Sequence, residues 1–507
     1  MASENTKRIA KNTGMLYFRM LVTMLVSLYT SRVILHALGV DDFGVFGVVG
    51  GVIVLLSFLT NALSTAMQRF LAFELGKGNK EQLKKIFGVG ISVQLMVIVI
   101  VLILAETIGL WFVNYKLKIP LDRVYAANWV YQFTIITFII NLLIVPYNAV
   151  LIAYEKMTFY AYMSIAESVL RLTMALLLQF MIFDKLIAYA GFISAIVFII
   201  FLLYFFYCRR TFAISRTFAL WEPQLFKKLM SFSGWSVLGT FSDVAVVQGI
   251  NLLLNMFFGV VINAAMAIAY QVNAALNSFV LNFQTAFKPQ LIKVYASENK
   301  AYLHSLIVQT SKLSFFLLLI LVTPVLLNTS IILQWWLVTV PDYAVIFCQL
   351  VIISSLIDSI AGPLWITMQA TGKIKVYQIV ISIVLLSNLV ISYMLLKKGF
   401  DATAVLWVRI FICVLALFVR LFFVSKLTHF PLRLFFSKVL LKIVLACVIA
   451  LPLPLLAHYY MQGWQALLST TILSVICIGL CVYFIVLQSD EREFVNKILV
   501  KFIKKSK

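Results

Sequence analysis

Long apolar segments recur along the whole chain and are separated by short polar stretches. Each segment holds roughly 20 apolar residues, which is enough for a helix to cross the hydrocarbon core of a bilayer. Barrel strands are shorter and alternate apolar with polar positions, so helices are the expected spanning form. The pattern predicts an all-α polytopic membrane protein with about 14 transmembrane helices, at residues 14–37, 43–66, 87–113, 124–146, 158–182, 186–207, 231–257, 260–287, 303–328, 343–368, 375–396, 402–424, 438–458 and 464–487.

The second part of the chain resembles the first at an offset of about 220 residues. Each half holds six predicted spans, and because six is even, both halves enter the membrane in the same direction. We therefore expect two six-helix bundles related by a parallel repeat, as in transporters whose site lies between two halves. The matched positions are Gly14 with Gly234, Gly39 with Gly259, Asn79 with Asn299, and then, at an offset of 217, Pro146 with Pro363 and Lys156 with Lys373.

The repeat and the span limits divide the chain into five parts. These are an N-terminal six-helix bundle (1–207), a basic cytoplasmic linker (208–230), a C-terminal six-helix bundle (231–430), two appended transmembrane helices (431–487) and a cytoplasmic tail (488–507). In the tail, Asp490 and Glu493 have capping-box spacing before a segment with one apolar face. We expect this tail to be an amphipathic helix on the membrane surface, with a disordered basic tail as the alternative.

Composition and charge agree with a membrane protein and give its orientation. The chain is 63% hydrophobic and only 12% charged, which no soluble domain can accommodate. The net charge of +22 would suit a nucleic-acid binder, but 28 Lys and Arg residues fall on one side of the predicted topology and 6 on the other. By the positive-inside rule, both termini are expected in the cytoplasm. Anionic membrane lipids, rather than nucleic acids, are the expected partners of this charge.

Several function classes are disfavoured by what the sequence lacks. The longest extramembrane segment is the linker, so there is no room for a nucleotide-binding fold, and no P-loop pattern occurs. No group of His, Asp and Glu gathers near one interface, as expected for a membrane-embedded enzyme. The four His are scattered, so no metal site is predicted, and the six Cys lie within or beside spans, so no disulfide is expected. We expect a protein that is not an enzyme and needs no cofactor.

Two matched spans carry polar residues along one helical face. The predicted span at 43–66 and its end hold Ser57, Asn61, Ser64 and Gln68, and the span at 260–287 holds Asn273, Asn277 and Gln284. Residues spaced in this way share a face of a helix, and the offset of 220 places the two stripes on the same face in both halves. The stripes favour the lining of a polar cavity, while hydrogen bonding between packed helices is the alternative.

Charged residues at membrane depth are the next candidates, because such charges are costly and rarely face lipid. Arg19 and Arg32 lie on the first span, where snorkelling to the two interfaces is the alternative. Asp243 lies deeper, on the seventh span with Asn251, and is a candidate for ion coupling. Glu167 and Arg171 have the i, i+4 spacing of an ion pair, which favours a structural role. Isolated charges of lower rank are Glu106, Lys312, Asp358 and Arg409.

Amides and hydroxyls suit the hydroxyl groups of sugars, and Arg and Lys suit phosphate. A ligand with both chemistries is a lipid-linked oligosaccharide, in which sugars are carried on a pyrophosphate. The residues therefore favour a transporter with an amide-rich, basic central cavity.

Short motifs resemble those of a known family. The segment 38–46, Leu-Gly-Val-Asp-Asp-Phe-Gly-Val-Phe, resembles a turn typical of the polysaccharide-exporting branch of the MOP exporter superfamily. The segment 65–70, Thr-Ala-Met-Gln-Arg-Phe, and the following Gly-Lys-Gly-Asn at 76–79 are similar to that branch as well. The layout of two six-span halves plus two helices covers nearly the whole chain. The best match is a Wzx-type flippase for the repeat units of O-antigen, capsule or exopolysaccharide.

This resemblance implies a MATE-like fold and a function in polysaccharide biosynthesis at the bacterial inner membrane. The expected substrate is a polyprenyl-pyrophosphate-linked oligosaccharide that crosses by alternating access, with a polysaccharide polymerase and glycosyltransferases as further partners. By position, the resemblance implies that Arg19, Arg32, Arg69 and Lys288 meet the phosphates. The full set of expected substrate-binding residues is Arg19, Arg32, Arg69, Lys288, Ser57, Asn61, Ser64, Gln68, Asn251, Asn273, Asn277 and Gln284.

Two alternatives remain. One is a cation-coupled multidrug exporter of the same superfamily, which usually carries a carboxylate in its N-terminal bundle. Here the first two spans contain neither Asp nor Glu, while Asp243 lies in the second half. The other alternative, a membrane-embedded glycan-modifying enzyme, is disfavoured by the missing catalytic cluster.

Overall fold

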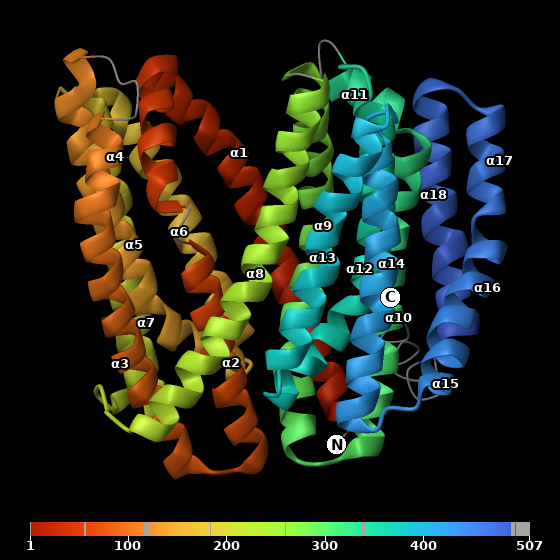
Figure 1. The fold of residues 1–507 in the computed structure, drawn as a ribbon, viewed down its shortest axis with the longest axis horizontal. Helices are drawn as coiled ribbons and strands as arrows, with labels where there is room; N and C mark the ends of the chain where they lie inside the picture. The colour runs from red at the N-terminus through yellow and green to blue at the C-terminus, as the bar shows by residue number, and fades with distance from the viewer. Residues whose placement is uncertain are drawn as a thin grey trace, which may run out of the picture. The chain divides into compact units, whose positions relative to one another are not determined.

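The computed structural model describes residues 2–54, 57–115, 121–182, 184–258, 260–336, 340–487 and 492. These residues form helices and short connections, and no strand occurs among them (Figure 1). Eleven helices in this described part are long and apolar enough to cross a bilayer. The predicted all-α membrane fold is therefore confirmed. The predicted amphipathic tail, apart from Arg492, lies outside the described residues.

The chain divides into two compact units. The N-unit is Lys11–Thr240, and the C-unit consists of Met1–Ala10 with Phe241–Lys507. The boundary falls inside one continuous helix, α8 (Pro223–Phe258), which begins within the stretch predicted as a linker. The linker region thus holds the end of α7, a short helical turn at Ala213–Arg216 and the first residues of α8.

The described residues of the N-unit form seven α-helices besides the start of α8, the first of which begins within the short N-terminal segment of the C-unit. They are α1 (Ala2–Val54), α2 (Ser57–Lys77), α3 (Lys80–Leu104), α4 (Leu110–Tyr115), α5 (Val124–Ala153), α6 (Met157–Leu177) and α7 (Lys185–Thr211). Within the unit, α5 packs against α2 and α7.

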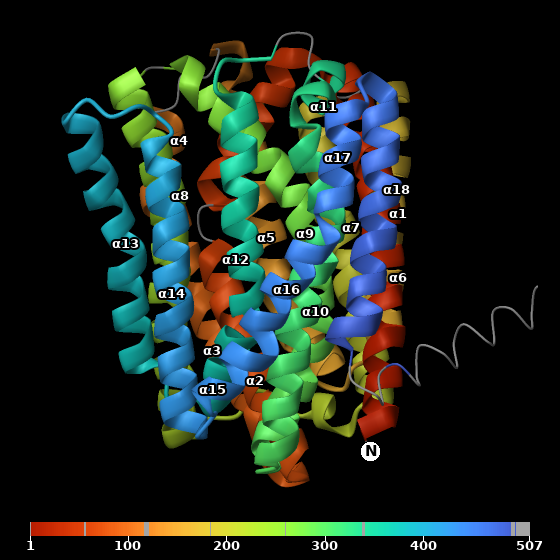
Figure 2. The same ribbon diagram turned by 90° about the vertical axis from the view of Figure 1, so that its right-hand side faces the viewer.

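In the part of the C-unit that the structure describes, the rest of α8 is followed by ten α-helices. They are α9 (Val260–Ala296), α10 (Lys300–Leu327), α11 (Thr329–Trp336), α12 (Ala344–Thr371), α13 (Lys375–Lys397), α14 (Ala404–Thr428), α15 (Leu432–Phe435), α16 (Leu441–Ala450), α17 (Pro452–Tyr460) and α18 (Gly463–Cys481). Here α12 packs against α9, α10 and α14, and Figure 2 shows α13, α14 and α12 as neighbours.

The turn predicted between the first two spans is a single break in α1 at Gly39. Its backbone has φ 76° and ψ 172°, a conformation that side chains with a Cβ rarely adopt. The helix resumes after this residue and continues to Val54, and α2 starts at Ser57. A glycine here lets one chain change direction without a loop.

The repeat seen in the sequence is matched by the local backbone. Asn79 caps α3 by accepting from the N–H of Gln82 at 3.1 Å, and Asn299 caps α10 by accepting from Tyr302 at the same distance. The residue before each cap, Gly78 or Glu298, has a positive φ of 73° or 58°. A side-chain cap satisfies an N–H that the helix cannot, so the same signal starts the equivalent helix in both units.

In the N-unit, ion pairs join the starts of α5 and α7 to α1. Arg123, directly before α5, donates to both Asp42 of α1 and Asp184, which caps α7. Burial lowers the pKa of the Arg123 guanidinium, but the two carboxylates outweigh burial and hold this pKa above its ordinary value. The arginine therefore stays charged and connects three helices.

In the C-unit, a neutral side chain has the equivalent place. Tyr343, directly before α12, donates its hydroxyl to Asp401 Oδ1 at 2.7 Å, and Asp401 also accepts from Thr403. Burial acts to raise the pKa of Asp401, but these hydrogen bonds outweigh it and hold the pKa below its ordinary value. The same carboxylate raises the pKa of Tyr343.

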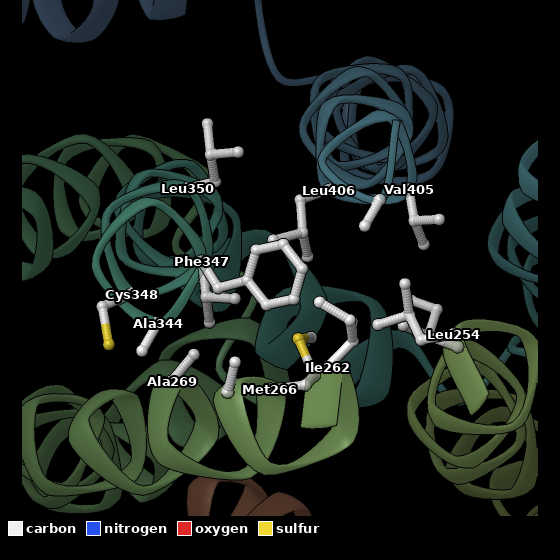
Figure 3. Packing of buried hydrophobic residues seen from close by; sticks show 14 of the residues in the cluster. Leu254, Ile262, Met266, Ala269, Ala344, Phe347, Cys348, Leu350, Val405 and Leu406 are labelled. Carbon is white, nitrogen blue, oxygen red and sulfur yellow. The ribbon is translucent and has the colours of Figure 1, made fainter. Parts of the chain in front are cut away.

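The apolar core of the C-unit lies where α9, α12 and α14 meet (Figure 3). Met266 of α9, Phe347 of α12 and Leu406 of α14 are completely buried and point toward one another. The helices α12 and α14 match α5 and α7 at the offset of 217, and the core residues of α9 match the part of α1 after Gly39 at the offset of 220.

The last helices attach to the bundle through polar and aromatic contacts with the α10–α11 region. Asn328, after α10, donates to Thr470 of α18 at 2.8 Å and lies 3.3 Å from His458 Nδ1 of α17. The rings of Trp335 and Trp464 lie 3.4 Å apart between centroids. Both Asn328 and Thr470 are buried, and a buried polar group is costly unless it is hydrogen-bonded.

Candidate functional site

The N-unit holds a partly open cavity of about 190 Å³. It lies among α1, α6 and α7, and no Asp or Glu occurs among the described residues that line it. One positive charge, from Arg171, faces the cavity. The full lining is Ser27, Thr30, Ile34, Ser168, Arg171, Met174, Tyr189, Phe192, Ile193 and Ile196.

Arg171 is held by the residue one helical turn before it on α6. Its Nε and Nη2 donate to Glu167 Oε1 at 3.0 and 2.7 Å. The predicted i, i+4 ion pair is therefore confirmed. Because both side chains are about one-third exposed, the pair contributes little to stability, and its effect is to orient the guanidinium.

The C-unit holds a larger cavity of about 400 Å³, lined by residues of α8, α9, α12, α13 and α14. Four charged residues face it: Asp243, Asp358, Arg409 and Arg420. Two acids and two bases give this cavity no net formal charge. Their neighbours in the lining include Gln284, Gly362, Trp365, Asn388 and Cys413.

The charges of the C-unit cavity are largely engaged with one another and with nearby hydroxyl and thiol groups. Arg420 Nη1 lies 3.5 Å from Asp358 Oδ1, and Cys413 donates to Asp358 Oδ2 at 3.5 Å. Arg409 donates to the hydroxyl of Tyr270 at 3.1 Å. Asp358 and Arg409, which looked isolated in the sequence, are therefore parts of one cluster.

The two cavities have equivalent places in the two units. At the offset of 217, the lining residues Arg171, Phe192 and Ile196 correspond to Asn388, Arg409 and Cys413, which line the other cavity. Ser27 corresponds to Val247 at the offset of 220 in the same way. The duplicated bundle thus keeps the cavity and changes its charged residues.

The amide stripe on α9 divides between two roles. Asn273 accepts from Ser355 of α12 at 2.7 Å, and Asn277 donates to the same hydroxyl at 3.2 Å. These two amides therefore join α9 to α12. For them, the alternative of hydrogen bonding between packed helices is the one observed. Gln284 lines the cavity, where it lies so close to Gly362 that a Cβ there would be 2.1 Å from Nε2.

The remaining predicted residues of the C-unit lie around this cavity or on its helices. Asp243 faces the cavity directly. The Lys288 ammonium lies 5.8 Å from the ring centroid of Trp365, a lining residue. Asn251 lies two turns after Asp243 on α8 and is partly exposed. The structure thus brings Asp243 and Gln284 together and leaves Asn251 outside the lining.

The predicted basic residues of the N-unit lie against aromatic rings. The Arg19 guanidinium is 4.8 Å from the ring centroid of Tyr160 on α6. Arg69 is 4% exposed and lies within 5.6 Å of the ring centroids of Phe70, Phe73 and Phe232. A phosphate-binding role for these residues stays a prediction. The side chain of Arg32 lies outside the described part.

The polar stripe predicted at Ser57 to Gln68 lies on α2. Gln68 donates to Ser64 at 3.0 Å, one turn earlier, and Asn61 is exposed. The side chain of Ser57 lies outside the described part. None of these residues lines the N-unit cavity, where the span-1 hydroxyls Ser27 and Thr30 are found instead.

Three arginines were missed as site residues, each for an identifiable reason. Arg171 was assigned to an ion pair, Arg409 was treated as isolated, and Arg420 was not singled out. The repeat alone could not pair Arg171 with Arg409, because at the offset of 217 Arg171 matches Asn388 and Arg409 matches Phe192. For Arg420, only the packing of α14 against α12 shows the partner. The described residues contain no cluster of His, Cys, Asp and Glu suited to a metal.

Comparisons with known proteins agree with this fold. Residues 16–177 match the protein-family model described as MatE. No curated protein sequence matches. A crystal structure of MATE in complex with MaD3S is similar at a TM-score of 0.72 and 15% identity, covering 84% of this chain and 97% of that one.

Two further solved structures have the same fold. An outward-facing multidrug resistance MATE family transporter of the MOP superfamily gives a TM-score of 0.74 at 14% identity, with 84% and 96% of the two chains covered. A MOP superfamily transporter from Pyrococcus furiosus, described as having a binding pocket of reverse polarity, gives a TM-score of 0.67 at 14% identity with the same coverage. The chain therefore has the fold of MATE transporters.

Proposed function

We propose that this protein is a MOP-superfamily transporter that moves a polyprenyl-pyrophosphate-linked oligosaccharide across the bacterial inner membrane by alternating access. The observation that carries the proposal is the N-unit cavity, where an oriented arginine and several hydroxyls face the cavity and no carboxylate is among the described lining residues. Such a surface suits an anionic, hydroxyl-rich substrate and disfavours a cationic one. The MATE fold supports transport as the activity.

The second candidate is a cation-coupled multidrug exporter. The MatE match and the similarity to a solved multidrug resistance MATE transporter favour this candidate over the flippase. Asp243 and Asp358 in the C-unit cavity offer carboxylates for ion coupling. Two observations count against it: the arginine-bearing N-unit cavity, and the arginines that already face the C-unit carboxylates. The similar Pyrococcus furiosus transporter, whose binding pocket is described as having reverse polarity, supports the view that this fold accepts more than one substrate class.

A membrane-embedded glycan-modifying enzyme is the least supported candidate. Neither cavity brings His together with carboxylates among its described lining residues, and general acid–base chemistry usually needs such groups. The partners that the flippase proposal implies are the lipid-linked substrate, membrane lipids, and a polysaccharide polymerase with its glycosyltransferases.

Deletion of the gene tests the proposal. Completed lipid-linked repeat units should accumulate on the inner leaflet, and surface polymer should be lost. Drug sensitivity should stay unchanged, whereas a deletion that leaves the polymer intact and sensitises cells to cationic drugs would favour the multidrug exporter. An altered glycan structure on the lipid would instead favour the enzyme.

The proposed orientation, with both termini and the 208–230 region in the cytoplasm, rests on the distribution of Lys and Arg. Cysteines introduced at Asp41 and Arg216 test it with a membrane-impermeant thiol reagent. Labelling from outside should reach position 41 and spare position 216. The reverse pattern would overturn the orientation.

A further inference from the structure

The ion pair with Glu167 uses only part of the hydrogen-bonding capacity of Arg171. An arginine has five N–H donors, and the bonds to Glu167 Oε1 take one on Nε and one on Nη2. Glu167 is not among the residues that line the N-unit cavity, while Arg171 is. The Glu167 carboxylate therefore orients the guanidinium without lining the cavity, and the other N–H groups of Arg171 can donate to a ligand there.

The hydroxyls of the cavity have the complementary role. Thr30 donates its proton to the Val26 carbonyl at 2.7 Å, and Ser168 donates to the Ser164 carbonyl at 2.9 Å. With their protons bound to their own helices, these oxygens can offer only lone pairs to a ligand. A ligand must therefore supply hydrogen-bond donors to them, as the hydroxyl groups of a sugar do.

The rest of the wall is apolar and limits the size of the ligand. Ile34, Met174 and Ile196 lie in this part of the lining, and the ring of Tyr189 packs against Phe46 at 4.8 Å. Apolar surroundings strengthen a hydrogen bond to a charged group. Since whole-ligand pockets usually measure about 300–1,000 Å³, a cavity of 190 Å³ holds one group of a larger molecule.

We propose that the N-unit cavity binds an oxyanion, either carboxylate or phosphate, that is carried beside hydroxyl groups. Arg171 donates to the oxyanion, Thr30 and Ser168 accept from the hydroxyls, and Glu167 positions the guanidinium. This assignment rests on the proposed transport of a glycan-pyrophosphate lipid and deepens it by naming a contact for the headgroup. The same chemistry occurs in a sugar acid, in a sugar phosphate and in the headgroup of phosphatidylglycerol.

The equivalent cavity of the C-unit lacks this arrangement. The residue that corresponds to Arg171 is Asn388, and the residue that corresponds to Ser168 is Leu385. Its arginines already face Asp358 and Tyr270. An oxyanion that entered this cavity would compete with carboxylates for the same donors, so the site is assigned to the N-unit alone.

Binding of small probes to the purified full-length chain tests the site. Titrations followed by saturation-transfer NMR should show saturable binding of glucose 1-phosphate and glucuronate, and weaker binding of glucose. Arg171→Ala should weaken the two acidic probes at least tenfold, and Arg171→Lys should fall between, because lysine keeps the charge and loses the planar fork. Arg210→Ala removes an exposed arginine near the end of α7 and should bind as the wild type does.

Two variants of Glu167 test whether this residue positions Arg171 or only repels anions, because the two roles predict opposite changes in probe binding. Glu167→Gln keeps an oxygen acceptor for Arg171 and should leave probe binding equal or tighter. Glu167→Ala removes the acceptor and should weaken binding about threefold or more, although a repelling negative charge is lost as well. Tighter binding by Glu167→Ala would show that the residue only repels anions, which would overturn its positioning role.

Further measurements show whether the oxyanion comes from a lipid headgroup or from a sugar, and distinguish failure of the site from failure of the flippase proposal. If phosphatidylglycerol displaces glucose 1-phosphate and phosphatidylcholine does not, a lipid headgroup can occupy the site. If neither lipid displaces the probe, the occupant is a sugar acid or a sugar phosphate. Wild-type protein that binds neither acidic probe, or folded Arg171→Ala that binds both normally, overturns the site. If the probes bind through Arg171 while the deletion strain keeps its surface polymer, the site stands and the flippase proposal fails.

Discussion

The two cavities show how duplicated bundles can keep a shape and change its chemistry. In the N-unit cavity, one arginine faces the cavity and its carboxylate partner lies outside the described lining. In the C-unit cavity, two acids and two bases face the same space, and Arg420 lies 3.5 Å from Asp358. Helix contacts constrain the residues that pack, whereas cavity-facing residues have few neighbours and can change freely.

A similar difference exists where the helices begin. Arg123 binds two carboxylates in the N-unit, while Tyr343 binds one in the C-unit. In the N-unit, this contact joins the start of α5, which holds the repeated proline, to the start of α7 at Asp184. In the C-unit, it joins the start of α12, which holds the matching proline, to the start of α14 at Asp401. The duplicated fold thus conserves a connection whose chemistry differs.

The largest expected effect comes from making the N-unit cavity like its counterpart. Arg171→Asn places the residue found at the equivalent position, Asn388, in the N-unit. One lost charge-assisted hydrogen bond costs about 1.5–3 kcal/mol, so substrate affinity should fall about tenfold or more. Surface polymer in a deletion strain complemented at matched protein level measures the loss. Asn388→Arg should keep transport, and normal polymer from Arg171→Asn would contradict the comparison.

The next effect concerns the charge cluster of the C-unit. Arg420→Met removes the partner of Asp358 and leaves a carboxylate that is 43% exposed to the cavity. The free energy of unfolding, measured by SDS titration in mixed micelles, should fall by about 1–1.5 kcal/mol, because solvent screens a carboxylate that is partly exposed. Adding Asp358→Asn should restore part of this loss, since the unpaired charge is gone. Strictly additive losses would show that the two residues are not coupled.

A smaller effect tests whether the α9 amides serve packing. Ser355→Ala removes the hydroxyl bound by Asn273 and Asn277 and should cost about 1 kcal/mol, because interhelical hydrogen bonds in membranes average about 0.6 kcal/mol each. Ser359→Ala is the matched control on α12, since that hydroxyl donates to the carbonyl of its own helix. If the two variants have equal stability, Asn273 and Asn277 do not serve packing, and a cavity-lining role is favoured.

The smallest effects are expected where the helices begin. Arg123→Ala should lower the free energy of unfolding by about 1 kcal/mol and Tyr343→Phe by less, because exposed pairs contribute about 0.2–1 kcal/mol each. The folded-state pKa of Asp401 lies below its ordinary value of 3.8, so its contribution is present above that pH and is lost as the pH falls below it. Melting temperatures between pH 7 and 3 should therefore fall less steeply for Tyr343→Phe. An identical acid dependence would mean that this hydrogen bond does not hold the pKa down.

The sequence could predict features that depend on neighbouring residues or on the repeat. Span-length helices, the Asn79 and Asn299 equivalence and the Glu167–Arg171 pair all follow from local pattern, and the structure confirms the helices and the pair. The two helix caps are local as well, since each side chain reaches only three residues ahead.

Features that depend on packing between distant helices could not be predicted. Asp358 and Arg420 are far apart in the chain, and nothing in either helix shows that their side chains meet. The bond between Asn273 and Ser355 likewise requires knowing which faces of α9 and α12 are in contact. For this reason the polar stripe was recognised while its division between packing and cavity was not.

Transport of a lipid-linked oligosaccharide by this protein can be measured after reconstitution into vesicles. Full-length protein in vesicles that contain a fluorescent polyprenyl-pyrophosphate oligosaccharide should move the headgroup between leaflets, measured by the fraction accessible to an added membrane-impermeant quencher. Translocation above that of empty vesicles is expected, with a rate about tenfold lower for Arg171→Ala than for Arg210→Ala. No translocation above empty vesicles, together with uptake of a cationic dye driven by a proton or sodium gradient, would overturn the flippase function and favour the multidrug exporter.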